Sequence, residues 1–110
     1  GALIESKQRV DAFSLLQSLH PSAAVCGTPR NIAFDIITEV EGMNRGRYAG
    51  PVGWIDASGD GELGIALRSG QITDREIRIF AGCGIVAGSN PEKELEESNA
   101  KMIAMRSALH

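Results

Sequence analysis

The chain has 110 residues, of which 43% are hydrophobic and 23% are charged, a composition typical of one small globular domain. Its net charge of −3 argues against a protein that binds nucleic acid through phosphate contacts. The sequence has no apolar run of membrane-spanning length and no signal peptide, so we expect a cytoplasmic protein that does not bind membranes.

Two helices are predicted in the first part of the chain. Apolar side chains recur at helical spacing over Arg9–Leu19, which predicts a helix that ends before Pro21. Thr28 followed by proline gives a cap and a first turn, and predicts a second helix over Pro29–Glu41 that Gly42 closes. This second helix is expected to bury five apolar side chains, those of Ile32, Ala33, Ile36, Ile37 and Val40.

The hydrophobic period then changes to two, which is typical of strands. Strands are predicted over Val52–Ile55, Leu63–Arg68 and Arg75–Ala81, with a turn at Asp56–Gly61 and a polar connection at Gln71–Asp74. Short strands joined by tight turns predict an antiparallel three-stranded meander. The expected fold class is α+β, with two helices, the meander and a C-terminal helix, and no internal domain boundary.

A glycine-rich turn connects the last predicted strand to a helix expected over Pro91–Leu109. Gly82 and Gly84 remove side chains where the backbone bends or another group approaches closely. Ser89 or Asn90 precedes the helix as its cap. The backbone N–H groups of such a turn favour a bound anion.

Three charged residues of this helix, Glu94, Glu97 and Lys101, are spaced by three and four positions and therefore share one face. Two carboxylates and an ammonium beside the glycine turn would suit a cation bound together with an anion. The alternative is an ordinary i,i+4 ion pair on a solvated helix, and the spacing alone fits both. An apolar stripe is expected beside this face, formed by Leu95, Met102, Met105 and Leu109.

Tyr48 and Arg68 form a second candidate pair. A guanidinium offers a bidentate fork to a carboxylate, and a phenol adds one hydrogen bond. Taken alone, Arg68 is better explained as a solvated arginine at the end of a strand.

Other candidate chemical motifs are weak. The turn at Asp56–Gly61 begins like a calcium loop, but the bidentate glutamate of such a loop is missing, so we predict a hairpin turn. Cys26 and Cys83 are not in a Cys-x-x-Cys pair and are expected to be small core residues. His20 precedes a proline and His110 is the last residue, which leaves little material for a histidine metal site.

Three stretches carry a family resemblance: Leu19–Arg30 (LHPSAAVCGTPR), Arg47–Gly70 (RYAGPVGWIDASGDGELGIALRSG) and Ile79–Met102 (IFAGCGIVAGSNPEKELEESNAKM). In order and spacing they resemble the C-terminal part of the chorismate-utilising enzymes, and most closely the isochorismate synthases. The resemblance covers nearly the whole chain. It implies that residues 1–110 are the C-terminal part of one chorismate-binding domain, within a larger fold whose N-terminal part is absent from this chain.

The resemblance also implies a role for individual residues. Glu97 resembles a Mg²⁺ ligand, with Glu94 beside it as a ligand through water. Tyr48 and Arg68 resemble the pair that binds the carboxylate of the enolpyruvyl arm of chorismate.

Four further residues resemble parts of the substrate site. Gly82 and Gly84 look like the glycines whose backbone borders the ring carboxylate, and Lys101 like a lysine near a substrate carboxylate. Ala24 stands where ammonia-using relatives tend to carry threonine, which favours water as the nucleophile.

The implied reaction is that of an isochorismate synthase, an isomerase that exchanges the ring hydroxyl of chorismate with water in the presence of Mg²⁺. In the family, a lysine base, a glutamate acid, a second Mg²⁺-binding glutamate and a histidine are expected upstream of Leu19–Arg30. We therefore assign no catalytic residue to this chain and expect it to be inactive alone. The pathway served (menaquinone, siderophore or salicylate) stays open.

Two alternative functions remain at this point. The chain would act as a non-catalytic assembly or interaction module if it exposed an apolar patch or associated with itself. Within the enzyme class, it would otherwise derive from a salicylate or anthranilate synthase relative. The sequence leaves the oligomeric state open, and self-association is one option.

Overall fold

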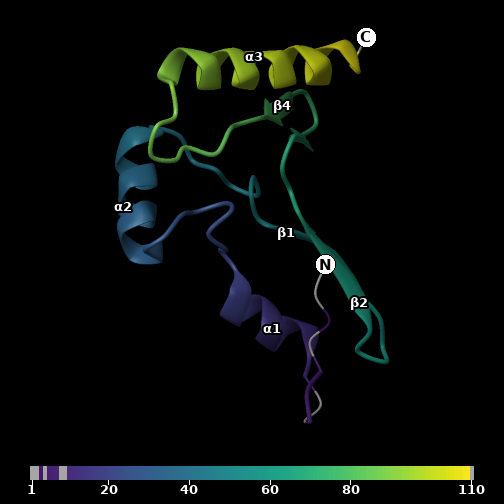
Figure 1. Cartoon of the computed structure of the whole chain (residues 1–110). Helices are drawn as coiled ribbons and strands as arrows, with labels where there is room; N and C mark the ends of the chain where they lie inside the picture. Colours follow the sequence, from purple (N-terminus) through teal and green to yellow (C-terminus); the bar gives the residue numbers. More distant parts are fainter. Residues whose placement is uncertain (1–2, 4, 8–9, 110) are drawn as a thin grey trace.

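The computed structural model describes residues 3, 5–7 and 10–109. Three helices and two antiparallel two-stranded sheets make up the fold, so the predicted α+β class is confirmed (Figure 1). The elements in chain order are α1 (Ala12–Leu19), α2 (Arg30–Val40), β1 (Pro51–Ile55), β2 (Gly61–Ile65), β3 (Ser69–Ile72), β4 (Ile77–Phe80) and α3 (Pro91–Ser107).

Helix α1 begins later than its apolar pattern suggested, because an acidic side chain caps it. Asp11 accepts hydrogen bonds from the backbone N–H of Ser14 (2.9 Å) and from its hydroxyl (2.6 Å). These bonds lower the pKa of Asp11 below its usual range. The helix ends at His20, which is extended as expected before a proline. Arg9, the predicted first residue, lies outside the described residues.

Helix α2 lies within its predicted range, but its cap and its burial were predicted wrongly. Pro29, not Thr28, occupies the N-cap position, and no side chain bonds the first turn. The glycine closure is confirmed, since Gly42 follows the helix with a φ of +60°. The five side chains expected in the core are not buried: Ala33 and Ile37 are half-buried, and Ile32, Ile36 and Val40 are exposed.

Strands β1 and β2 form the predicted hairpin. Their register pairs Pro51 with Ile65 and Trp54 with Glu62. The Asp56 carboxylate accepts the backbone N–H groups of Ser58 (2.8 Å) and Asp60 (3.1 Å), which closes the turn. The hairpin reading of this segment is therefore confirmed.

The predicted second strand, Leu63–Arg68, is wrong in its second half. Strand β2 ends at Ile65, whose carbonyl accepts the Leu67 N–H at 2.7 Å, and Arg68 has a φ of +45°, in the left-handed region. The chain changes direction there. Gln71 and Ile72, predicted as part of a polar connection, instead lie in β3, which pairs with β4. The result is two separate hairpins in place of one three-stranded meander.

Helix α3 begins and ends close to its prediction. Asn90 is the N-cap and accepts the Lys93 N–H at 2.9 Å, and Pro91 occupies the first turn. The helix contacts β4. The predicted apolar stripe is only partly right, because Leu95 and Leu109 are exposed. The half-buried face consists of Glu94, Ser98, Lys101, Met102 and Met105.

Very little of the chain is buried. Among the described hydrophobic side chains only Ala49 and Phe80 are buried, each 7% exposed. The radius of gyration is 16.6 Å, compared with about 13 Å for a compact domain of this length. Figure 1 shows α1, α2 and α3 lying apart from one another, with the β1–β2 hairpin extending away from α3. In the part of the chain described here, no helix combines the length and apolarity needed to cross a membrane.

Candidate functional site

Tyr48 lies at the centre of a cluster of aromatic and charged side chains. Its ring stacks on Phe80, with centroids 5.1 Å apart and planes 10° apart. The guanidinium of Arg45 lies 5.6 Å from the same ring centroid. The loop that carries both residues is itself closed by a bond from the Tyr48 N–H to the Arg45 carbonyl, 2.9 Å long. The ring therefore interacts with two side chains, those of Phe80 and Arg45.

Gly82 lies next to the hydroxyl group of Tyr48. A Cβ atom at this position would be 2.8 Å from the Tyr48 hydroxyl oxygen, closer than real Cβ contacts allow. The site thus needs glycine at position 82 because of a close approach between two segments far apart in sequence. Gly84 differs, since a Cβ there would meet no atom within 4 Å.

Lys101 connects helix α3 to this glycine segment. Its ammonium donates to the Gly82 carbonyl at 2.9 Å and to a carboxylate oxygen of Glu97 at 2.5 Å. Its side chain is 23% exposed, whereas that of Glu97 is 56% exposed. The ordinary i,i+4 ion pair of a solvated helix is therefore present between Glu97 and Lys101. Lys101 also makes a tertiary hydrogen bond to Gly82, which a simple solvated pair would not have.

The charges of the cluster act on Glu97. The hydrogen bond and the positive charge of Lys101 hold the pKa of the Glu97 carboxyl below its usual range, and the charge of Arg68 acts in the same direction. Arg68 is thus electrostatically coupled to the α3 face, although it lies in the bend between β2 and β3. Five predicted site residues are brought into one region: Tyr48, Arg68, Gly82, Glu97 and Lys101.

Glu94 lies one turn before Glu97 and is half-buried. The Cys83 thiol donates to the Glu94 backbone carbonyl at 3.5 Å, which ties the helix start to the glycine segment. Burial raises the pKa of the Cys83 thiol, and the Glu94 side chain adds to this. A raised pKa disfavours the reactive thiolate form of Cys83. Cys26 and Cys83 were expected in the core, but both are only half-buried.

The described residues of this region form no closed cation site. Among the described residues, no group of three or more His, Cys, Asp or Glu side chains is placed to hold a metal ion. Mg²⁺ is commonly bound by only one or two protein carboxylates together with water and substrate oxygens. Glu94 and Glu97 are the carboxylates of this region that could take part in such a site.

Arg45 is a site residue that the sequence reading missed. Its guanidinium binds both carboxylate oxygens of Glu41, one of them from Nε at 2.7 Å, and donates from Nη1 to the Val25 carbonyl at 3.0 Å. The hydrogen bond to Glu41 raises the pKa of Arg45. Its spacing of four from Glu41, across the end of a predicted helix, was the available signal. Ala24 precedes Val25, is exposed and lies in a turn beside this network.

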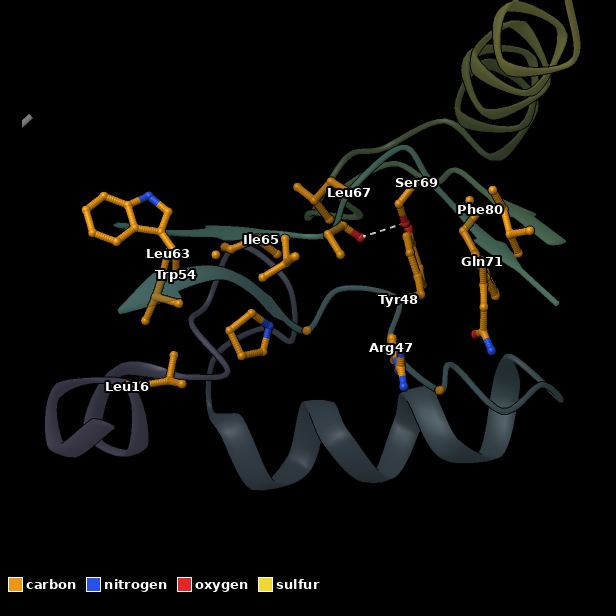
Figure 2. Close-up of a pocket in the computed structure, with 18 of the residues that line it drawn as sticks. Leu16, Arg47, Tyr48, Trp54, Leu63, Ile65, Leu67, Ser69, Gln71 and Phe80 are labelled. Atoms are coloured by element: carbon orange, nitrogen blue, oxygen red, sulfur yellow. Dashed lines mark hydrogen bonds between the residues drawn. The ribbon is translucent and has the colours of Figure 1, made fainter. Parts of the chain in front are cut away.

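A cavity adjoins the polar cluster without including most of it. It has a volume of about 1080 Å³ and lies over the β1–β2 hairpin, with Tyr48 and Phe80 at one end (Figure 2). Figure 2 shows Trp54, Leu63 and Ile65 on its hairpin side. The other predicted site residues do not line it. We place the candidate chemical site at the polar cluster, because opposite charges and hydrogen-bond donors converge there.

The comparisons with known proteins agree on one family. A family model described as "Chorismate binding enzyme" matches residues 4–110. The isochorismate synthase MenF of Bacillus subtilis is 47% identical over 103 residues, which is 94% of this chain and 22% of that protein. Anthranilate synthase component 1 of Aquifex aeolicus is 42% identical over 105 residues, 96% of this chain and 21% of that protein.

A solved structure gives the same result for the fold. It is a Bacillus anthracis crystal structure assigned as a 2,3-dihydroxybenzoate-specific isochorismate synthase, DhbC. The TM-score is 0.84 at 40% identity, over 90% of this chain and 26% of that chain. The chain therefore spans about a quarter of the length of the relatives that it matches.

Proposed function

The chain belongs to the chorismate-binding enzyme family, and we propose that it is the C-terminal part of an isochorismate synthase. The observation that carries this proposal is the convergence of Tyr48, Gly82 and Lys101 with the charges of Glu97 and Arg68. These residues come from four separate segments of the chain: the loop before β1, the bend between β2 and β3, the segment after β4, and α3. The proposed substrate is chorismate.

Chorismate is a dicarboxylate, so its site needs positive charge and donors at two places. We assign the carboxylate of the enolpyruvyl arm to Arg68 and Tyr48, whose fork and phenol match one carboxylate. The ring carboxylate is assigned to the backbone of Gly82 and Gly84, with Lys101 beside it. The stacking of Tyr48 on Phe80 supports this assignment, because a fixed ring presents its hydroxyl in one position.

Two glutamates of α3 are the proposed Mg²⁺ ligands: Glu97 would bind directly and Glu94 through water. Bound Mg²⁺ would neutralise a substrate carboxylate and fix the ring. Lys101 holds the Glu97 carboxylate by a hydrogen bond, which keeps this group ionised and oriented. An ionised carboxylate is the form that a cation requires.

The proposed reaction exchanges the ring hydroxyl of chorismate with water. In this proposal the general base, the general acid and further Mg²⁺ ligands belong to a part of the enzyme outside this chain. The chain itself binds and orients the substrate and is expected to show no turnover alone. A cytoplasmic location is part of the same proposal, and the described cysteines, Cys26 and Cys83, are both unpaired.

A second candidate is an ammonia-using enzyme of the anthranilate synthase kind. It is favoured by the 42% identity to the Aquifex aeolicus relative. Ala24, at the position where ammonia-using relatives tend to carry threonine, argues for water and is why we rank this candidate second.

The test is an assay of the parent gene product with chorismate and Mg²⁺, supplied with water alone or with ammonia. We expect isochorismate as the product and no activity from the 110-residue chain. Arg68→Gln and Glu97→Gln in the parent should each lower kcat/KM by about 100-fold, because each removes a charge from the substrate or metal site.

Glu96→Gln is the matched control for these variants, since Glu96 is exposed on the same helix and lies outside the cluster. Formation of anthranilate with ammonia would establish the second candidate. Equal losses in the Glu96 and Glu97 variants would remove the site assignment.

A further inference from the structure

Arg45 makes contacts that link three segments of the chain. It follows Glu41, the residue that ends α2, at a spacing of four, and the two side chains form an ion pair. A solvated pair of this kind contributes little to stability. Two further contacts of Arg45 reach beyond the helix end, to the Val25 carbonyl and to the ring of Tyr48. These contacts indicate a role that an isolated ion pair would not have.

The guanidinium of Arg45 is fixed by hydrogen bonds from all three of its nitrogen atoms. Nε donates to one carboxylate oxygen of Glu41 at 2.7 Å, and Nη2 donates to the other oxygen. Nη1 donates at 3.0 Å to the backbone carbonyl of Val25, twenty residues earlier in the chain. A planar group bonded at three atoms has one defined position and orientation, which a flexible arginine on the surface lacks.

The fixed guanidinium lies over the ring of Tyr48, 5.6 Å from its centroid, where a cation is attracted to the aromatic face. Phe80 stacks on the same ring, and the backbone of Gly82 lies next to its hydroxyl group. Arg45 therefore restrains the body of the ring, and the position of the ring sets the position of the hydroxyl.

The backbone between Arg45 and Tyr48 is also closed by hydrogen bonds. The Tyr48 N–H donates to the Arg45 carbonyl at 2.9 Å, and the Asn44 side chain accepts the Gly46 N–H at 2.8 Å. A continuous series of contacts thus runs from the end of α2 through Glu41 and Arg45 to the phenol of Tyr48.

We propose that Arg45 is a positioning residue of the substrate site, which acts through Tyr48 and does not itself contact the substrate. This rests on the proposed function, in which the Tyr48 phenol binds a substrate carboxylate. A hydrogen bond to that carboxylate forms well only when the donor is held at the right distance and angle. Arg45 keeps the phenol in place before the substrate arrives, so that less ordering is needed on binding.

The alternative is a role in stability alone, in which the contacts of Arg45 with Glu41 and Val25 hold the fold and leave Tyr48 unaffected. A double-mutant cycle separates the two roles. If Arg45 acts through the phenol, its removal causes no further loss once the hydroxyl is gone. If the two residues act independently, their losses multiply.

The test is the cycle of Arg45→Met and Tyr48→Phe in the parent enzyme, assayed with chorismate and Mg²⁺. Each single variant should lower kcat/KM about tenfold, the effect of one lost hydrogen bond. The double variant should also lose about tenfold, whereas independent effects would give about 100-fold. Arg75→Met is the matched control, since Arg75 is exposed in the turn between β3 and β4, and it should change kcat/KM by less than about twofold.

Glu41→Gln provides a second variant that keeps Arg45 and the ring. It removes the negative charge that holds the guanidinium, so kcat/KM should fall about threefold. This loss should disappear in the Tyr48→Phe background. The variant keeps the test decisive if Arg45→Met folds poorly.

A further measurement does not depend on activity. Tyr48 is the only tyrosine of this chain, so the proton NMR signals of a labelled tyrosine ring are assigned without ambiguity. The nuclear Overhauser effect between that ring and the Gly82 Hα should be lost in Arg45→Met, because the ring is no longer held beside the glycine. It should be unchanged in Arg75→Met.

Three results would overturn the proposal: independent losses in the cycle, no loss in Arg45→Met where Tyr48→Phe shows one, and an Overhauser effect that Arg45→Met leaves unchanged. Each of them leaves the proposed function intact. A Tyr48→Phe variant with full kcat/KM has a different meaning. It would show that the carboxylate assignment to Tyr48 is wrong, and the positioning role of Arg45 would fail with it.

Discussion

At the scale of single residues, Gly82 is a position where the site leaves no room for a side chain. A methyl group there would meet the Tyr48 hydroxyl at 2.8 Å, and the ring cannot easily give way because Phe80 and Arg45 hold it. We expect Gly82→Ala to destabilise the chain by about 1–3 kcal/mol, as overpacking does. Urea unfolding measures the loss, and NMR shifts of the Tyr48 ring report the displacement.

Gly84→Ala is the matched control, because the added methyl group meets nothing within 4 Å. Its effect should stay within about 0.5 kcal/mol. If both alanine variants behaved alike, the close approach of Tyr48 to Gly82 would be wrong.

The ion pair on α3 predicts a pH dependence. The pKa of Glu97 is lowered in the folded chain, so the pair with Lys101 stabilises the fold above the ordinary pKa of a glutamate, about 4.3, and this contribution is lost as the pH falls through the lower folded value. Carbon NMR of the side-chain carboxyl should show Glu97 titrating below that ordinary value.

Lys101→Met should raise the pKa of Glu97 toward the ordinary value, since it removes the hydrogen bond and the positive charge that lower this pKa most. Lys93→Met, on the same helix, is the control and should leave the Glu97 titration unchanged. A titration that Lys101→Met does not move would show that the pair is absent in solution.

At the scale of elements, α3 depends on its cap. Asn90 accepts the Lys93 N–H at 2.9 Å, and Asn90→Ala should cost about 1 kcal/mol of local stability. Amide exchange in the first turns of α3 should then be about fivefold faster. Asn99→Ala makes the same substitution inside the helix and should leave exchange unchanged or slower, because alanine has the higher helix propensity.

The elements also show what the sequence could predict. α2 and α3 were found because a proline at the helix start, a glycine after α2 and a capping asparagine before α3 are local signals. β3 was missed because Ser69–Ile72 (SGQI) carries little strand propensity and gains its structure from pairing with β4. The break before it depends on the φ of Arg68, which no local pattern announces.

The same distinction applies to the site. The Glu97–Lys101 pair is local and followed from helix spacing. The contact of Tyr48 with Gly82 joins residues far apart in sequence, and only the family resemblance placed both in one site before the structure did. Burial was predicted worst. Apolar spacing assigned Ile32, Ile36 and Val40 to a core, whereas the described chain leaves them exposed.

At the scale of the whole molecule, the open arrangement is directly measurable. Small-angle X-ray scattering of the chain should give a radius of gyration well above the value of about 13 Å for a compact domain, near the 16.6 Å of the structure. The value should not change on dilution. A compact value would mean that the apolar faces close on one another, and a value that falls on dilution would mean self-association.

The backbone conformation of Arg68 affects stability as well as the proposed site. Its φ of +45° places a large L-residue where glycine is favoured, at a cost of roughly 1–2 kcal/mol. Its guanidinium is also the charge that reaches Glu97 from the bend between the two hairpins. Stability and activity therefore oppose each other at this one position. A search for more stable variants would select glycine at position 68, and it would discard the group to which we assign a substrate carboxylate.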